Sequence, residues 1–179
     1  MLVNYVKIDL SMKVFIIACL TADGFIGQNA DHLSTTWTSP EDTKFFIKMS
    51  KEAGVVVMGS RTFSTINRPL PGRRLIVYTP NADDIKVADV ETTNEDPVAL
   101  VKRLENEGAQ AVAIAGGASI YAMFMASGVV DELYLTIEPV IFGQGLPLFN
   151  ETLPAIKLTL IDSQALNPNT MMLHYAFNK

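Results

Sequence analysis

The chain has 179 residues and a formal net charge of −5, with 14 Lys and Arg residues against 19 Asp and Glu residues. This length is typical of one domain with a substantial core, and the acidic balance argues against a nucleic-acid binder, which needs a basic surplus. An apolar content of 49% excludes a disordered chain, and no apolar run reaches the roughly 20 residues of a membrane-spanning helix. The single cysteine, Cys19, excludes an internal disulfide, and with only two histidines a Cys/His zinc site is not expected.

We predict an N-terminal extension over residues 1–11 and a single domain over residues 12–179. Lys7 and Asp9 place charges in the first segment, and no small-residue cleavage site follows it, so it does not resemble a secretion signal. Met12 directly precedes a strong apolar run and is a second candidate for the start of the native chain. These features predict a cytoplasmic protein.

Short, nearly continuous apolar runs predict strands that are buried on both faces, as in a parallel sheet. They cover residues 14–20, 55–58, 75–78, 111–115 and 133–137. Helices are predicted between them, over residues 40–53 with Ser39 as N-cap, over 60–66, over 97–107, and from Gly116-Gly117 to near Gly128.

The pattern changes after residue 149. Two further strands, residues 158–161 and 171–177, flank an Asn-Pro-Asn turn signal and predict an antiparallel pair. We therefore predict a single-domain α/β fold with a mostly parallel central sheet, flanking helices and an antiparallel C-terminal edge.

Two predicted strand-to-helix turns carry glycine and are candidate anion sites. In Met58-Gly59-Ser60-Arg61-Thr62 a helix follows a strand directly, so free N–H groups and the helix dipole attract anions, and Arg61 adds a charge. Gly116-Gly117 repeats the arrangement and lets the backbone approach a ligand closely. Many such turns only reverse the chain. Two at the carboxyl edge of one sheet favour a ligand with a diphosphate or two separated phosphates.

Asp42 is the acid in the most informative position. Ser39-x-x-Asp42 matches a capping box, and the local sequence by itself favours that interpretation. Phe46, Met49 and Ala53 follow at helical spacing, however, so Asp42 shares their predicted buried face. A carboxylate there needs a donor partner, and the ring edge of a pterin or a pyrimidine offers two parallel N–H groups. Both interpretations stay open at this point.

Other polar residues have a plain structural interpretation beside a functional one. The basic turn from Arg68 to Arg74 is typical of a solvated loop, or of an arginine fork that captures a substrate carboxylate. The single tryptophan, Trp37, is most typical of a core position. From the residues alone, His32, His174 and Cys19 are interpreted as structural.

Several motifs occur in a fixed order along the chain. The most specific is MGSRTFSTINRPLPGR, residues 58–73; the others are Asp23-Gly-Phe-Ile-Gly27, Trp37-x-x-Pro40-x-Asp42, Gly116-Gly117-x-x-x-Tyr121 and Leu133-Tyr-Leu-Thr136. Together they resemble the dihydrofolate reductase family from Lys13 onward. The resemblance implies the fold of that family, NADPH as cofactor, and hydride transfer to pterin C6 of 7,8-dihydrofolate. The product would be 5,6,7,8-tetrahydrofolate, which implies a place in tetrahydrofolate biosynthesis and one-carbon metabolism.

The resemblance also implies roles for single residues. The implied catalytic group is Asp42 on the 2-amino and N3 edge of the pterin, Thr136 hydrogen-bonded behind it, and Trp37 beside the nicotinamide. The implied substrate contacts are Phe46, Ile66, Leu70 and, on the glutamate α-carboxylate, Arg73. The implied cofactor contacts are Cys19, Ile26, Gly116, Gly117 and Tyr121 at the nicotinamide, Gly59, Ser60, Arg61 and Thr62 at the phosphates, and Thr79 at the 2′-phosphate.

Some positions depart from the family pattern. The segment between Gly27 and Trp37 is slightly longer than in compact bacterial members. Ser60 stands where a basic residue is usual, and Ala118 and Ser119 stand where a further glycine or basic residue is usual. These departures weaken the implied preference for NADPH over NADH.

Two other functions remain as alternatives. Residues 130–149 also resemble the reductase domain of riboflavin biosynthesis, which shares the fold and acts on a ribosylamino-pyrimidine phosphate. The deaminase signature, H-x-E with P-C-x-x-C, is absent, so the bifunctional form of that enzyme is excluded. A non-catalytic nucleotide-binding module is the other alternative, although such a module need not keep Asp42, Trp37, Thr136 and Arg73 together. We expect dihydrofolate as partner, with no nucleic acid and no membrane, and a homodimer stays open.

Overall fold

A computed structural model of the chain describes residues 8 and 10–177. Most of the predicted N-terminal extension, residues 1–11, therefore lies outside the described residues. Of the remainder, the Ile8 amide donates to the Gly128 carbonyl at 2.9 Å, and the Ser11 amide donates to the Glu105 carboxylate at 2.8 Å. A domain boundary at residue 12 stays a prediction.

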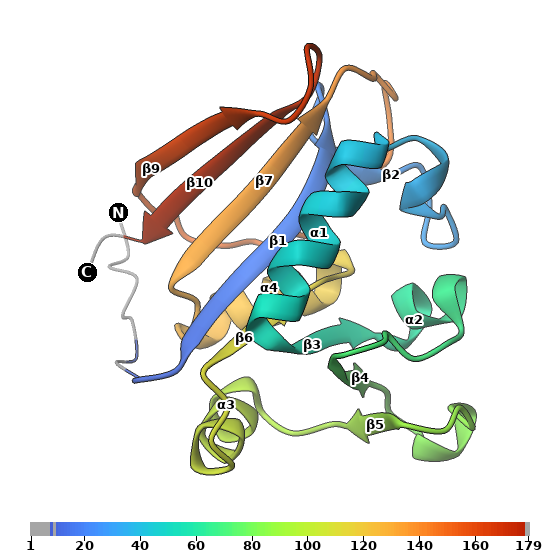
Figure 1. Ribbon diagram of the computed structural model, residues 1–179, viewed down its shortest axis with the longest axis vertical. Coiled ribbons are helices and arrows are strands. Elements are labelled where there is room, and N and C mark those ends of the chain that lie inside the picture. The colour runs from blue at the N-terminus through green and yellow to red at the C-terminus, as the bar shows by residue number, and fades with distance from the viewer. Residues whose placement is uncertain (1–7, 9, 178–179) are drawn as a thin grey trace.

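An eight-stranded sheet forms the centre of the fold (Figure 1). Its strands are β1 (Lys13–Thr21), β3 (Gly54–Gly59), β4 (Arg74–Tyr78), β5 (Val90–Thr93), β6 (Ala111–Ile114), β7 (Glu132–Glu138), β9 (Leu158–Ala165) and β10 (Met171–Phe177). The spatial order is β5-β4-β3-β6-β1-β7-β10-β9. Neighbours from β5 to β7 pair in parallel, and β10 pairs antiparallel to both β7 and β9. A separate pair joins β2 (Phe25–Gly27) to β8 (Leu146–Pro147).

The helices are α1 (Pro40–Ala53), α2 (Ser60–Ile66), α3 (Pro97–Asn106) and α4 (Ala118–Ser127), with short 3₁₀ turns η1 (Ser34–Thr36) and η2 (Ala82–Asp84). The predicted helices and strands are confirmed, and α1 and α2 have the predicted bounds. Strands β2, β5 and β8 were not predicted, because they are short and lie outside the long apolar runs. The predicted α/β fold with an antiparallel C-terminal edge is confirmed.

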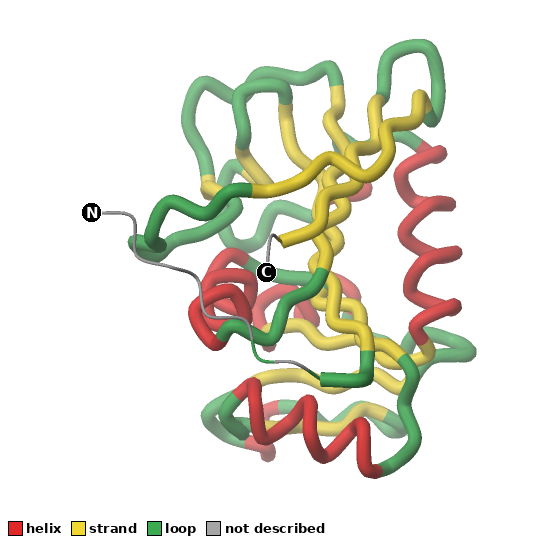
Figure 2. The backbone as a smooth tube through the Cα atoms, turned by 90° about the vertical axis from the view of Figure 1, so that its left-hand side faces the viewer, coloured by secondary structure: helices red, strands yellow, loops and turns green. Residues whose placement is uncertain are grey.

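The two faces of the sheet carry different helices because successive strand residues point to opposite faces. Phe15 and Ile17 of β1 pack with Phe46 and Met49 of α1 on one face. Val14, Ile16 and Ala18 of β1 pack with residues of α3 and α4 on the other face. Figure 2 shows this layering, with α1 standing to the right of the strands.

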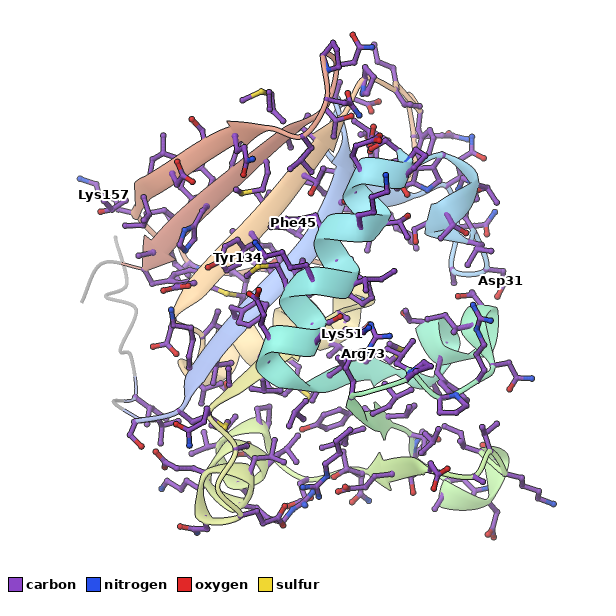
Figure 3. All side chains as sticks on the ribbon, viewed as in Figure 1. Asp31, Phe45, Lys51, Arg73, Tyr134 and Lys157 are labelled. Atoms are coloured by element: carbon purple, nitrogen blue, oxygen red, sulfur yellow. The ribbon has the colours of Figure 1, made fainter. Side chains whose placement is uncertain are left out.

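Local sequence explains where α1 begins and ends. Pro40 occupies the first helical position, and the Ser39 hydroxyl accepts a hydrogen bond from the Asp42 amide at 3.2 Å. Gly54 ends the helix with a φ of 76°, which glycine adopts without strain. Figure 3 shows Phe45 on the side of α1 facing Tyr134 of β7, and the two ring centroids lie 6.2 Å apart. The first turn of α1, with Asp42, is thereby held near the carboxyl ends of the strands.

Among the described residues, no helix combines the length and apolar character that a membrane crossing requires.

Candidate active site

A cavity of about 490 Å³ lies at the carboxyl ends of β1, β3, β4 and β6. This is the edge at which open α/β sheets bind ligands. Its wall is built by these strand ends, by the first turns of α1, α2 and α4, and by the loop before η1. The cavity therefore joins segments that lie far apart in the sequence.

Most residues predicted for the site line this cavity. They are Cys19, Ile26, Asp42, Phe46, Gly59, Ser60, Arg61, Thr62, Ile66, Gly116, Gly117 and Tyr121. The two glycine turns, for which the sequence favoured one shared ligand, open into the same space.

Trp37 and Thr136 do not lie on the cavity wall. The Trp37 ring packs edge-on against Phe142 at a centroid distance of 5.2 Å, and the centroid of His32 lies 6.5 Å from it, so Trp37 belongs to an aromatic cluster. Its Nε1 is buried and finds no hydrogen-bond partner among the described residues. Thr136, only 1% exposed, lies behind the wall and hydrogen-bonds to the Asp42 carboxylate, which is the arrangement that the resemblance implied.

Three further predicted residues also lie off the wall. Arg73 is beside α1, near Lys51 in Figure 3, and its guanidinium donates to the Ser50 hydroxyl at 2.9 Å. Leu70 packs on the apolar cluster around Phe63 instead. Thr79 is buried and its hydroxyl donates to the backbone carbonyl of the following turn, at Asn81, at 3.0 Å. Each of these three side chains has a contact within the fold, and the ligand contacts implied for them stay predictions.

The capping box at α1 is only half formed. The Ser39 hydroxyl caps the Asp42 amide, as predicted. The Ser39 amide, however, donates to Oε1 of Glu138 at 2.7 Å rather than to Asp42. The Asp42 carboxylate accepts instead from Thr136, Thr38 and Cys19. Asp42 therefore serves the cavity as well as the helix start.

The environment of Asp42 disfavours its charge. Burial raises the pKa of Asp42 and the negative charge of Glu138 raises it further, whereas hydrogen bonds from Thr136, Thr38 and Cys19 lower it, and the net effect is a raised pKa. Burial, followed by Asp42 and Glu138, also raises the pKa of the Cys19 thiol. Cys19 therefore stays protonated and can donate to the carboxylate. Burial likewise raises the pKa of Tyr121, whose hydroxyl donates to the Ile17 carbonyl at 2.8 Å.

The two glycine turns touch each other. The Gly59 amide donates to the Gly116 carbonyl at 2.8 Å. A Cβ atom at Gly59 would lie 3.0 Å from Ile120 Cγ1, and one at Gly116 would lie 3.0 Å from the ring and hydroxyl of Tyr121. Gly116 also has a φ of 102°, which residues with side chains rarely adopt. This part of the wall is therefore backbone, with the N-termini of α2 and α4 facing the cavity.

Some cavity residues were not singled out from the sequence. His32, interpreted there as structural, lines the cavity and its ring nitrogen Nδ1 accepts from the Gln28 amide at 3.1 Å. Tyr78 lines the cavity where Thr79 was predicted. Glu138 is 3% exposed and faces Asp42 from behind the wall. Glu138 stands two residues after Thr136 on one strand, so the two side chains share a face. The sequence already contained this signal.

Residues 13–166 match the family model described as dihydrofolate reductase. The chain belongs to the dihydrofolate reductase family. A type 3 dihydrofolate reductase of Salmonella typhimurium is 37% identical over 125 residues, which cover 70% of this chain and 71% of that protein.

Solved structures show the breadth of this fold. The dihydrofolate reductase of Enterococcus faecalis, complexed with NADP(H), superposes with a TM-score of 0.75 at 22% identity, covering 93% of this chain and 97% of that one. A putative riboflavin biosynthesis protein of Shewanella sp. PV-4 gives a TM-score of 0.74 at 19% identity, covering 94% of this chain and all of that one. The family match and the curated relatives support an oxidoreductase of the dihydrofolate reductase-like superfamily. The fold, which both structures share, does not select the substrate.

Proposed function

We propose that this member of the family reduces 7,8-dihydrofolate to 5,6,7,8-tetrahydrofolate with NADPH. The observation that carries the proposal is the Asp42 carboxylate, which lines the cavity and is held by neutral donors. A carboxylate in such surroundings is suited to two parallel N–H groups of a pterin edge, because charge-assisted pairs of this kind are strong and directional.

The backbone part of the wall fits the cofactor. A Cβ atom at Gly59 or Gly116 would lie 3.0 Å from Ile120 or Tyr121, a tight contact, so glycine keeps the backbone open toward the cavity. The first amides of α2 and α4 and the Arg61 side chain form an electropositive edge that suits phosphates. We assign phosphate contacts to Gly59, Ser60, Arg61 and Thr62, and nicotinamide contacts to Cys19, Ile26, Gly116, Gly117 and Tyr121. When bound, NADPH supplies the hydride.

The chain's own residues orient and charge the substrate. Asp42 accepts from the pterin edge, and its negative charge stabilises the cationic ring that forms when N5 takes a proton, which we assign to water. Thr136 and Thr38 fix the carboxylate by donating to it. Phe46 and Ile66 give the cavity an apolar wall that excludes water from the ring. Arg73, held by Ser50 outside the wall, is our candidate for the glutamate tail of folate.

A second candidate is reduction of a ribosylamino-pyrimidine phosphate. Residues 130–149 and the likeness to the Shewanella structure favour it. A ribitol or ribose phosphate needs an anion pocket on the substrate side, whereas Asp42 and Arg73 suit a pterin edge and a carboxylate. We therefore place folate first.

Turnover with each substrate tests the proposal. Purified protein is mixed with NADPH and dihydrofolate, and the loss of nicotinamide absorbance is followed; parallel reactions contain the ribosylamino-pyrimidine phosphate, or NADH in place of NADPH. We expect turnover with dihydrofolate and NADPH. Turnover with the pyrimidine phosphate alone would transfer the assignment to the second candidate. Cofactor binding by calorimetry without turnover of either substrate would identify a non-catalytic nucleotide-binding module.

A further inference from the structure

Glu138 is a buried carboxylate that the proposed reaction does not use directly. It ends β7, is 3% exposed, and lies on the strand face that carries Thr136 and looks toward α1. Its Oε1 accepts from the Ser39 amide at 2.7 Å and its Oε2 accepts from the Thr170 hydroxyl at 2.9 Å. Both oxygens therefore already have donors inside the fold.

These contacts connect Glu138 to Asp42 through the start of α1. Ser39 is the N-cap, so its amide is fixed by Glu138 while its hydroxyl holds the Asp42 amide. Terminal atoms of Glu138, Asp42 and Cys19 lie within 4.8 Å of one another. Thr170 follows the turn between β9 and β10, and Asn167 of that turn donates to Glu41 of α1 at 3.3 Å. The first turn of α1 is thus tied to the C-terminal hairpin at two points.

We propose that Glu138 is a positioning residue for Asp42. It fixes the turn that presents the Asp42 carboxylate to the cavity, and it places a second negative charge behind that carboxylate. The role of this pair in substrate binding rests on the proposed function. The structural link between Glu138 and Asp42 does not depend on the proposed function.

The direction in which the charge of Glu138 shifts the pKa of Asp42 can be predicted. The titratable groups that face Asp42 are Cys19 from β1, Glu138 from β7 and Tyr121 from α4. Cys19 and Tyr121 are held neutral because burial raises the pKa of each. Glu138 is therefore the neighbour whose charge raises the pKa of Asp42, and its removal lowers that pKa.

Two substitutions separate the charge of Glu138 from its hydrogen bonds. In Glu138→Gln the side-chain oxygen can still accept from the Ser39 amide, and the new amide group can donate to the Thr170 hydroxyl, so the geometry is kept and the charge is lost. In Glu138→Leu both hydrogen bonds are lost. Glu41→Gln is the matched control, because it removes a carboxylate charge next to Asp42 in sequence while its remaining side-chain oxygen can still accept from Asn167.

The readout is the titration of the Asp42 carboxyl carbon, followed by NMR on protein labelled with ¹³C-aspartate, with Asp42→Asn to assign the signal. We expect the midpoint to move to lower pH in Glu138→Gln and to stay unchanged in Glu41→Gln. In steady-state assays the acid limb of kcat/KM is expected to move in the same direction. KM for dihydrofolate is expected to rise roughly tenfold in Glu138→Leu, because the Ser39 amide loses the acceptor that fixes the start of α1, and to be rescued in Glu138→Gln.

These outcomes distinguish this inference from the proposed function. An unchanged Asp42 titration in folded Glu138→Gln, together with an unchanged KM in folded Glu138→Leu, would overturn the positioning role even if dihydrofolate is reduced. If the Asp42 titration shifts in a protein that does not reduce dihydrofolate, the link between Glu138 and Asp42 is supported and dihydrofolate is rejected as the substrate. If Glu138→Leu does not fold, the NMR titration of Glu138→Gln alone decides.

Discussion

The two halves of the cavity are built by different means. On the α1 side the wall consists of side chains: Asp42 is held by Thr136, Thr38 and Cys19, with Glu138 behind it. On the α2 and α4 side the glycine turns of the wall are bare backbone, and a Cβ atom at Gly59 or Gly116 would lie only 3.0 Å from Ile120 or Tyr121.

This difference determines how each half responds to substitution. In the side-chain half, function depends on the charge and donor state of a few groups, so an isosteric change can remove activity while the fold survives. In the glycine half, function depends on backbone shape, so even one methyl group acts first on stability. We expect kinetic effects from the first half and folding effects from the second.

Asp42→Asn is the largest expected effect and tests the side-chain half. We predict at least a tenfold loss in the rate of dihydrofolate reduction at pH 7, because a strong polar contact to a developing charge contributes about 3 kcal/mol. Loss of nicotinamide absorbance measures the rate. Asp162→Asn, on the exposed edge strand β9, removes an equivalent charge away from the cavity and should leave the rate unchanged.

The same variant, Asp42→Asn, is expected to lose activity but to gain stability. Because the pKa of Asp42 is raised in the folded state, its ionisation costs stability as pH rises through that pKa. Asp42→Asn should therefore raise the free energy of unfolding at pH 7, and this gain should vanish below the ordinary pKa of 3.8. A variant that is both less active and less stable at pH 7 would contradict the separation of the two halves.

Gly116→Ala is the next largest effect and tests the glycine half. Gly116 has a φ of 102°, and a Cβ atom there would lie 3.0 Å from Tyr121. Tyr121 is held in place because its hydroxyl donates to the Ile17 carbonyl. We predict a loss of about 2 kcal/mol or more in the free energy of unfolding, measured by urea denaturation.

Gly108→Ala is the matched control for this prediction. Gly108 has a φ of 89° but nothing within 4 Å of its Cβ position, so only the conformational cost, about 1 kcal/mol, is expected. Equal losses in the two variants would show that the contact with Tyr121 carries no weight, and the glycine half would then be no more tightly packed than a surface turn.

Sequence patterns predicted the central sheet well because its inner parallel strands are mostly buried on both faces. Val55, Val56 and Val57 are each at most 6% exposed, and such runs stand out in any window. β5, with the sequence VETT, escaped because it is an edge strand with polar residues. β2 and β8 escaped because their pairing is set by contacts between distant segments rather than by local pattern.

The candidate site was predictable where one element decides the geometry. Helical spacing placed Asp42 on the cavity side of α1 even though the cap motif offered a local alternative. Trp37 and Arg73 could not be placed in this way, because Phe142 and Ser50, which determine their orientation, come from elsewhere in the chain. Glu138 was accessible from the alternation of β7, but its partners Ser39 and Thr170 were not.

Tyr78→Phe is the smallest expected effect and asks whether the glycine half also depends on a side chain. The Tyr78 hydroxyl is buried and finds no hydrogen-bond partner among the described residues. Burial, together with the nearby charges of Glu95 and Asp96, raises its pKa, so the phenol is neutral. Removal of an unpaired buried hydroxyl should change the free energy of unfolding by less than about 1 kcal/mol, in the stabilising direction, and leave NADPH affinity unchanged.

Tyr121→Phe provides the contrast, because that hydroxyl donates to the Ile17 carbonyl at 2.8 Å and its loss should destabilise by about 1 kcal/mol. Urea denaturation of both variants and calorimetric titration with NADPH measure the two quantities. A tenfold weaker NADPH affinity in Tyr78→Phe would mean that the unpaired phenol finds its partner on the cofactor. In that case the backbone would not act alone in this half, because a buried side chain would share the binding that we assign to the glycine turns.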